Sequence, residues 1–209
     1  MGVGDELIVF NGEGGEYRAE ILALDKKTVT VQTGAHQAVE TRSPLKVHLG
    51  IAMSRGERMD WVVQKATELG VNSLTPLASE RTEVKLKGDR AARKLQHWRQ
   101  VAISACEQCG RDLLPLIHPV ENLADWVKRN DDDCKLVLHH RATSHTERAP
   151  PTSVALLVGP EGGLSAAEIT LAERAGFESL ALGPRVLRTE TAPLAALAIL
   201  QSRWGDMDF

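Results

Sequence analysis

The sequence has few cysteines, no long apolar run and no secretion signal. Its 209 residues include three cysteines, an odd number that does not suit a disulfide framework. Cys106 and Cys109 form one CxxC pair, and no second pair accompanies it to complete a zinc site. No run reaches the roughly 18 consecutive apolar residues of a membrane span, and the N-terminus lacks a basic segment followed by an apolar one. We therefore expect a cytoplasmic protein without a membrane span or a bound metal.

Two common nucleotide-binding motifs are also missing. No Gly-x-Gly-x-x-Gly motif opens a first βαβ unit, and no phosphate loop ends in Gly-Lys-Ser/Thr, which argues against a Rossmann-type nucleotide enzyme. His139, His140 and His145 lie near one another, but no metal-ligand spacing accompanies them. We expect these histidines to occupy core or loop positions.

The composition is that of an ordinary globular protein, with 43% hydrophobic and 25% charged residues. The formal net charge of −3 argues against indiscriminate binding to nucleic acid. Residues 81–99 are an exception, because they contain seven basic and two acidic side chains. This segment fits either a phosphate-contacting surface or the solvated flank of a helix.

The first part of the chain has the pattern of a small β-rich module. Residues 6–10, 16–24 and 28–33 favour strands, and Asn11-Gly12 and Gly14-Gly15 are turn signals between them. Arg42-Ser-Pro44 interrupts this pattern and predicts a domain boundary. We therefore expect a β-rich module over residues 1–43 and a second domain over residues 44–209.

Strand and helix patterns alternate in the second domain. The expected strands cover residues 47–53, 73–77, 113–117, 135–139, 154–158 and 179–182, and the expected helices cover residues 57–69, 90–109, 123–129, 166–175 and 194–204. This alternation predicts an α/β domain built on a parallel sheet. Ser54 with Glu57, and Ser165 with Glu168, have the spacing of a capping box at the start of a helix.

One expected helix carries an apolar stripe that includes both cysteines of the CxxC pair. The residues that share this face at helical spacing are Ala91, Leu95, Trp98, Ala102, Ala105, Cys106 and Cys109. We therefore expect both thiols to face a core rather than to bind a metal or to undergo redox chemistry.

Two Gly-Pro loops near the C-terminus each follow a short apolar strand. The first loop is Gly159-Pro-Glu-Gly-Gly163, and the second runs from Gly183 to Pro193. Both leave the carboxyl end of a strand, where ligands bind in open α/β sheets. The loop at residues 78–82 leaves another strand in the same way. We expect these loops to meet at one edge of the sheet.

The composition of the two Gly-Pro loops favours a flat ligand. Glycine removes side chains, so that a nucleoside-like molecule can lie against backbone amides and carbonyls, and proline stiffens the surrounding loop. A single Gly-Pro pair is typical of an ordinary turn. The second loop adds Arg188-Thr-Glu-Thr191, which an ordinary turn does not require.

These loops resemble the signature loops of the bacterial 16S ribosomal RNA uridine-N3-methyltransferases, members of the SPOUT superfamily. The matching segments are Val158-Gly-Pro-Glu-Gly-Gly-Leu-Ser165 and Leu182-Gly-Pro-Arg-Val-Leu-Arg-Thr-Glu-Thr-Ala192. The resemblance extends upstream through Arg58-Met-Asp-Trp-Val-Val-Gln-Lys-Ala-Thr-Glu-Leu-Gly70, Ser79-Glu-Arg-Thr82 and Cys106-Glu-Gln-Cys-Gly-Arg111, and so covers nearly the whole chain.

The resemblance implies S-adenosylmethionine as the methyl donor and a deep C-terminal trefoil knot. It also implies a homodimer whose interface completes each site, and an N-terminal PUA-like module that binds RNA. The module here lacks the first strands and the basic segment that normally precede the equivalent of residues 3–5. The implied cofactor-binding residues are Leu138, Gly159, Pro160, Glu161, Gly162, Gly163, Leu182, Gly183, Val186, Leu187, Arg188, Thr191 and Ala192.

Methylation of uridine N3 removes a proton from that atom and leaves charge on the neighbouring carbonyl oxygens, which an arginine can stabilise. Arg188 is the first choice for this role and Arg185 the second. Glu161 and Glu190 are the candidate proton acceptors or base-orienting groups, and the two roles stay open. The candidate substrate-binding residues are Arg81, Lys85, Lys87, Arg111, Arg185 and Thr189.

The expected substrate is unpaired uridine in 16S rRNA, within the assembled small ribosomal subunit, because N3 lies on the Watson–Crick edge. The shortened N-terminal module favours one alternative function, a catalytically silent RNA-binding protein that keeps the same fold. Binding of S-adenosylmethionine would separate the two.

Overall fold

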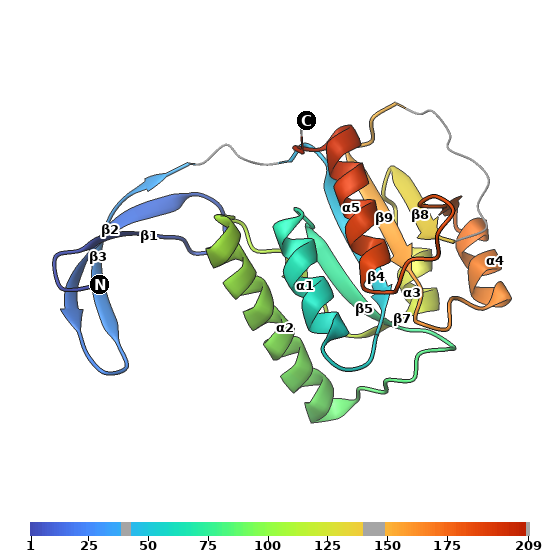
Figure 1. Cartoon of the computed structure of the whole chain (residues 1–209), viewed down its shortest axis with the longest axis horizontal. Helices are drawn as coiled ribbons and strands as arrows, with labels where there is room; N and C mark the ends of the chain where they lie inside the picture. The colour runs from blue at the N-terminus through green and yellow to red at the C-terminus, as the bar shows by residue number, and fades with distance from the viewer. Residues whose placement is uncertain (39–42, 140–148, 208–209) are drawn as a thin grey trace.

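The computed structural model describes residues 1–38, 43–139 and 149–207, and arranges them in a small antiparallel sheet beside a larger α/β domain (Figure 1). The small sheet contains β1 (Glu6–Val9), β2 (Glu16–Leu24) and β3 (Val29–Gln37) in that order, with antiparallel pairing throughout. The predicted boundary at residues 42–44 lies partly outside the described residues.

The α/β domain is built on a seven-stranded sheet. Its strands are β4 (Lys46–Ala52), β5 (Ser73–Ala78), β6 (Leu116–Ile117), β7 (Glu121–Asn122), β8 (Cys134–Leu138), β9 (Ser153–Val158) and β10 (Glu178–Leu180). They follow the order β10-β8-β9-β4-β5-β6, with β7 paired to β5, and every pairing is parallel. The parallel α/β class predicted from the alternating pattern is confirmed, and so is the β-rich module that precedes it.

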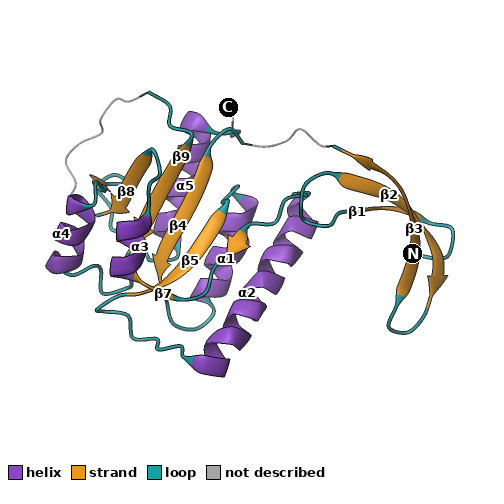
Figure 2. Ribbon diagram, turned by 180° about the vertical axis from the view of Figure 1, so that it is seen from behind, coloured by secondary structure: helices purple, strands orange, loops and turns teal. Residues whose placement is uncertain are grey.

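Helices cover both faces of the parallel sheet. They are α1 (Arg58–Glu68), α2 (Gly88–Cys109), α3 (Leu123–Arg129), α4 (Ala166–Arg174) and α5 (Thr191–Trp204). Helices α1, α2 and α5 lie in front of the sheet in Figure 1, and Figure 2 shows α3 and α4 on the opposite face. None of the helices in the described part of the chain is long and apolar enough to cross a bilayer.

The sheet separates two hydrophobic cores, and β9 shows how the sequence builds both. Leu156 belongs to the core under α1, α2 and α5, whereas Leu157 belongs to the core under α3 and α4. Successive side chains of a strand point to opposite faces, so the continuous apolar run predicted for this strand serves a sheet that is covered on both sides. Gly50 in β4 leaves room for the second core, because a Cβ atom there would lie 2.6 Å from Trp126 Cζ2.

One predicted capping box forms, and the other does not. At the start of α4, the Glu168 amide donates to Ser165 Oγ (3.2 Å) and the Ser165 amide donates to Glu168 Oε2 (2.8 Å). The box predicted for Ser54 and Glu57 is wrong, because Glu57 itself is the N-cap of α1 and makes no side-chain cap. Ser54 instead lies two residues after the end of β4 and is 95% buried.

Two further expectations need correction. Helix α5 begins at Thr191 rather than at residue 194, because proline is tolerated in the first turn, where its missing N–H has no partner to lose. Cys106 is buried, but Cys109 is exposed, so only one thiol of the CxxC pair faces the core. Cys109 lies at the end of α2, where the stripe leaves the packed surface.

The small sheet contacts the α/β domain at the segment that follows α2. The Leu114 amide donates to the Gly12 carbonyl (3.0 Å), and the Gly15 amide donates to the buried carboxylate of Asp112. Figure 1 shows this contact beside the C-terminal end of α2. Among the described residues, the module is therefore held by backbone and charge-assisted hydrogen bonds and contributes no side chain to the two hydrophobic cores of the domain.

Candidate functional site

A cavity of about 340 Å³ lies at the carboxyl edge of β8, β9 and β10. We call it the carboxyl-edge pocket. It is lined by Arg81, Leu138, His139, Val158, Gly159, Pro160, Glu161, Gly162, Gly163, Leu164, Leu180, Leu182, Gly183, Arg185, Val186, Leu187, Thr189 and Ala192. The two Gly-Pro loops therefore meet at one site, although β8 separates their strands in the sheet.

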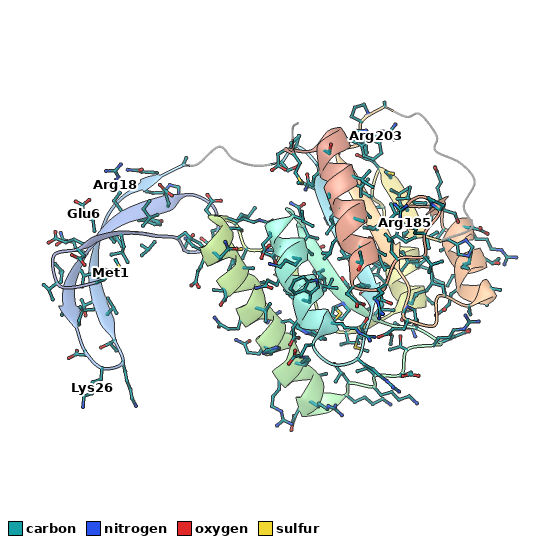
Figure 3. All side chains as sticks on the ribbon, in the orientation of Figure 1. Met1, Glu6, Arg18, Lys26, Arg185 and Arg203 are labelled. Carbon is teal, nitrogen blue, oxygen red and sulfur yellow. The ribbon has the colours of Figure 1, made fainter. Side chains whose placement is uncertain are left out.

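Most residues predicted to bind the cofactor line this pocket. The exceptions are Arg188 and Thr191, which do not contribute to its wall. Three residues predicted to contact substrate also line it: Arg81, Arg185 and Thr189. Figure 3 places Arg185 in the loop between β10 and α5. Sequence reasoning missed His139, Val158, Leu164 and Leu180. The signal for His139, Val158 and Leu180 was their position at or next to the end of a strand, and Leu164 lies directly before the N-cap of α4.

The first Gly-Pro loop is a tight turn around Gly159. A Cβ atom at Gly159 would lie 2.9 Å from Leu164 Cγ and 3.0 Å from the Leu164 amide nitrogen, so this position cannot carry a side chain without displacing the loop. The Gly163 amide donates to the Pro160 carbonyl (2.8 Å) and closes the turn. Gly163 has a φ of +68°, which disfavours other residues at that position.

Arg81 connects the loop after β5 to the first Gly-Pro loop. Its Nη1 donates to the Gly162 carbonyl (2.8 Å) and, at 3.4 Å, to the Leu164 carbonyl. The neighbouring Glu80 amide donates to Glu168 Oε1 (2.9 Å), so the carboxylate that caps α4 also holds this loop. The loops predicted to converge at one edge of the sheet do so, and Arg81 fixes the backbone of the pocket wall.

Arg58, at the start of α1, holds two of the predicted catalytic residues. Its Nη1 donates to Glu161 Oε1 (2.8 Å), and its Nε lies 4.0 Å from Glu190 Oε1. Burial raises the pKa of Glu161, but hydrogen bonds from backbone amides, including that of Arg55, and from Arg58 outweigh this effect and lower the pKa overall. Glu161 is therefore a carboxylate at neutral pH and a weaker base than a free glutamate.

The structure separates the remaining predicted site residues from the pocket wall. Arg188 has an exposed side chain, and its carbonyl accepts the amides of Thr191 and Ala192 (2.9 Å each) at the start of α5. Arg111 is turned toward α1, where its Nη1 donates to the Thr67 carbonyl (3.0 Å). Lys85 and Lys87 are exposed on the segment before α2 and do not line the pocket.

An adjoining groove extends from the pocket toward α1. It is lined by residues 55–58, 80–83, Glu161 and Gly162, so Arg81, Glu161 and Gly162 belong to both cavities. Arg55, Arg58 and Arg81 line this groove, and Arg55 forms an ion pair with Glu83 across it. The groove gives the pocket a polar extension that suits a chain carrying phosphate groups.

Metal ligands do not gather at this site. Among the described residues, no group of three or more His, Cys, Asp and Glu side chains is close enough to hold a metal ion. His139 lines the pocket, while His140 and His145 lie outside the described residues. The chemistry available in the pocket wall comes from arginine, carboxylate, imidazole and hydroxyl groups and from the backbone.

Two family models match the chain. An RNA methyltransferase domain matches residues 41–201, and an RNA methyltransferase PUA domain matches residues 1–33. The first of these covers every strand and loop that forms the carboxyl-edge pocket. The second covers β1, β2 and part of β3.

Individual relatives lead to the same family. A ribosomal RNA small subunit methyltransferase E from Buchnera aphidicola is 39% identical over 97% of this chain and 84% of its own length. A methyltransferase from Legionella pneumophila, solved with bound SAM, has 45% identity and a TM-score of 0.94, covering 99% of this chain and 86% of the other. The ribosomal RNA small subunit methyltransferase E of Neisseria gonorrhoeae, solved with S-adenosyl methionine, has 36% identity and a TM-score of 0.92, covering 100% and 87%. The chain therefore belongs to the RNA methyltransferase family, as its Gly-Pro loops predict.

Proposed function

We propose that this protein transfers a methyl group from S-adenosylmethionine to N3 of an unpaired uridine in 16S rRNA, and that it does so in the cytoplasm on the assembled small ribosomal subunit. The observation that carries this proposal is the carboxyl-edge pocket, in which two Gly-Pro loops and the Arg81 loop meet. The relatives with known cofactor and substrate class span nearly the whole chain at 36–39% identity, which supports it.

The residues present suit the proposed donor. Leu138, Val158 and Leu182 give the pocket an apolar wall that fits an adenine ring. The glycines of the first Gly-Pro loop expose backbone amides and carbonyls. These groups can hydrogen-bond the polar edge of that ring directly, because no side chain covers them. The bound donor supplies a methyl group made electrophilic by its sulfonium sulfur.

The chain's own residues would align the acceptor and stabilise the charge that develops on it. Displacement at the methyl group requires the attacking N3 to lie in line with the bond that breaks, so orientation supplies much of the rate. Arg185 lines the pocket and can stabilise the charge on the uracil carbonyl oxygens once N3 loses its proton. Arg188, the first choice from sequence, lies at the end of the same loop with its side chain in solvent.

Glu161 and Glu190 are the two candidates for the group that accepts the proton from N3. The ion pair with Arg58 and the lowered pKa of Glu161 support an anchoring role for that carboxylate, which would fix the first Gly-Pro loop against α1. Glu190 lies farther from the same guanidinium, at 4.0 Å, and is the N-cap residue of α5. Glu190 therefore makes the weaker ion pair, whereas Glu161 lines the carboxyl-edge pocket and Glu190 does not.

We further propose a homodimer and a C-terminal knot. Trp61 on α1 and Ile199 on α5 are 51% and 50% exposed, and the two helices contact each other. Large exposed apolar side chains on two contacting helices favour an interface. Residues 1–43 would then supply an RNA-binding module, and residues 44–209 would supply the catalytic domain.

Titration calorimetry with S-adenosylmethionine tests the donor site. Gly162→Trp is the matched variant, because a Cβ atom at Gly162 meets only Arg81 side-chain carbons at 3.5 Å, an ordinary contact, while the indole would fill the pocket. We expect the parent to bind and the folded variant not to bind. Absence of binding by the parent would favour a catalytically silent RNA-binding protein.

Methylation of small ribosomal subunits that lack the modification tests the arginines. We expect Arg185→Ala to lower the rate by about 10² to 10³ while S-adenosylmethionine still binds, as for the loss of one charge-stabilising donor. Arg188→Ala gives the comparison between the two candidates. A loss in Arg188→Ala alone would return the role to Arg188, and unchanged turnover in both would remove arginine from the mechanism.

A further inference from the structure

A second cavity, of about 520 Å³, opens between the segment after β4 and the beginning of α2. We call it the Ser54 pocket. Its floor is apolar, because Met53, Met59 and Trp98 line it and are buried, with Val84 and Leu86 half-buried beside them. The segment before α2 alternates, so that Val84 and Leu86 turn inward while Lys85 and Lys87 face solvent.

The rim of the Ser54 pocket is basic. Arg55, Arg90, Arg93 and Lys94 line it, and no acidic side chain does. Arg55 is paired with Glu83 and Lys94 with Asp60 (2.8 Å). Arg90 and Arg93 make no ion pair with any other described residue, so both guanidinium groups are available to an anion at the mouth of the cavity. This placement supports the interpretation of the basic segment at residues 81–99 as a ligand-contacting surface.

Ser54 places a polar group within the apolar floor. Its side chain is 95% buried, and its Oγ makes no hydrogen bond within the described residues. A buried hydroxyl without a partner is costly, and the great majority of buried polar groups are paired. Ser54 lines the cavity, and a ligand that displaces the side chains covering its Oγ can satisfy this hydroxyl as both donor and acceptor.

The Ser54 pocket is continuous with the site of the proposed methyl transfer. The adjoining groove shares Arg55 and Gly56 with the Ser54 pocket, and it shares Arg81, Glu161 and Gly162 with the carboxyl-edge pocket. A strand with phosphate groups can therefore run from one cavity to the other along a polar path, in which three arginines alternate with four glutamates and two of the arginines are paired with glutamates.

We propose that the Ser54 pocket receives one nucleotide of the RNA strand that carries the target uridine. Its base lies against Met59, Val84 and Leu86 and hydrogen-bonds Ser54 Oγ, while its phosphate binds Arg90 and Arg93. This inference rests on the proposed function, because it takes RNA as the substrate. A nucleotide matches the cavity better than a phosphate ion alone, since the floor is apolar and the buried hydroxyl needs a partner.

Anisotropy of a labelled oligouridylate, in competition with inorganic polyphosphate, tests this proposal in the full chain. Polyphosphate carries the charge of a strand but no base. We expect Ser54→Met, which fills the cavity, to weaken oligouridylate binding by about tenfold, as for the loss of one stacked base, and to leave polyphosphate binding unchanged. Ser54→Ala keeps the volume of the cavity and should weaken only oligouridylate, by a few-fold.

The arginine pair gives the second arm of the experiment. Arg90→Ala combined with Arg93→Ala should weaken both probes and reduce the salt dependence of oligouridylate binding by about 1.4 in the slope of log K against log salt. Arg174→Ala combined with Arg203→Ala removes the same charge elsewhere and should change neither; Figure 3 shows Arg203 at the C-terminal end of α5. A loss with the arginine pair but none with either Ser54 variant would overturn the nucleotide proposal.

The outcomes separate this proposal from the proposed function. A parent that methylates small subunits and binds oligouridylate with an affinity insensitive to Ser54→Met and Ser54→Ala would contradict the pocket assignment and leave the function intact. A parent that shows the expected Ser54 dependence but does not bind S-adenosylmethionine would contradict the methyl-transfer function and leave the RNA site intact.

Discussion

The α/β domain and the three-stranded module bury their apolar side chains to very different degrees. The domain has two cores that contain large, fully buried side chains such as Trp98, Trp126 and Leu156. In the module, the described hydrophobic residues that are buried are Ala19 and Ile21. Ile8 and Val29 of the same sheet are 60% and 58% exposed.

This difference in burial implies different roles for the two regions. A sheet of three short strands with one weakly buried face is marginal on its own, whereas a parallel sheet covered on both faces is self-supporting. The carboxyl-edge pocket lies wholly within the α/β domain, so donor binding should not depend on the module. The exposed apolar surface of the module is available for RNA, the partner that we propose for it.

The largest expected effect tests whether the two regions unfold independently. Trp126→Ala removes a side chain that is 2% exposed and fills the space left by Gly50, so we expect a loss of about 3–5 kcal/mol in the free energy of unfolding. The matched change is Tyr17→Ala in the module, where Tyr17 contacts His36 with a ring separation of 5.1 Å. It should leave the main transition in urea unchanged.

A shift of the main transition by Tyr17→Ala would break the comparison, because it would show that the module and the domain unfold as one cooperative unit. Circular dichroism reports the transition of the whole chain. Hydrogen exchange of β2 amides reports the module separately.

The next effect concerns a polar cluster between α1 and α2. Asp60 accepts hydrogen bonds from Lys94 (2.8 Å), His97 (2.8 Å) and Trp98 (2.9 Å). We expect Asp60→Asn to lower the free energy of unfolding by about 2 kcal/mol at neutral pH, since hydrogen bonds to a charged acceptor are stronger than neutral ones. Chemical denaturation measures the loss, and Asp125→Asn on α3 is a control in which no such cluster exists among the described residues.

The contribution of Asp60 should depend on pH in a defined direction. Burial raises the pKa of this carboxyl, but the hydrogen bonds from Lys94, His97 and Trp98 lower it by more than burial raises it. The pKa in the folded state therefore lies below the pKa in the unfolded state. The stabilisation is therefore complete above about pH 4 and is lost as the pH falls through the folded pKa. The difference between parent and Asp60→Asn should shrink in acid, and a difference that grows in acid would contradict this assignment.

A third change should weaken the contact between the two regions without unfolding either of them, and its effect should be smaller. Asp112→Ala removes the carboxylate that accepts the Gly15 amide and should weaken the docking of the module by about 1.5 kcal/mol, as for a buried donor that loses its partner. Hydrogen exchange at Gly15 and Leu114 should accelerate. Affinity for RNA should fall by up to about tenfold, while S-adenosylmethionine affinity should not change. Equal losses of both affinities would show that the two regions are not functionally separate.

The sequence was sufficient to predict the elements that repeat a pattern. The parallel sheet follows from apolar runs such as residues 154–158, and the start of α4 follows from Ser165 and Glu168, whose side chains satisfy local backbone groups. The pocket was predictable because glycine and proline mark loops at strand ends, and the chain order of those strands places the loops at one edge.

Contacts between distant segments were not predictable from the same patterns. The ion pairs of Arg58 with Glu161 and Glu190 depend on where α1 lies relative to two loops more than a hundred residues away. The position of Arg188 depends on where α5 starts. The proline in the first turn of α5 led the sequence pattern to place that start too late in the chain. Ser54 had the spacing of a cap, but the strand that precedes it carries its side chain into the interior instead.

The smallest expected effect concerns Ser54, whose buried hydroxyl is an exception within the well-packed domain. Ser54→Ala should raise the free energy of unfolding by about 1 kcal/mol, because it removes a buried hydroxyl that has no partner among the described residues. The matched change is Thr67→Val, where the hydroxyl is equally buried but donates to the Val63 carbonyl (2.7 Å). That variant should be destabilised by about 1 kcal/mol. Suppose that the free energy of unfolding rises in Ser54→Ala and falls in Thr67→Val, and that Ser54→Ala binds RNA more weakly. These results would identify Ser54 as a residue that lowers stability in order to bind a ligand. A loss of stability in both would mean that the Ser54 hydroxyl is satisfied in the free protein and is not reserved for a nucleotide.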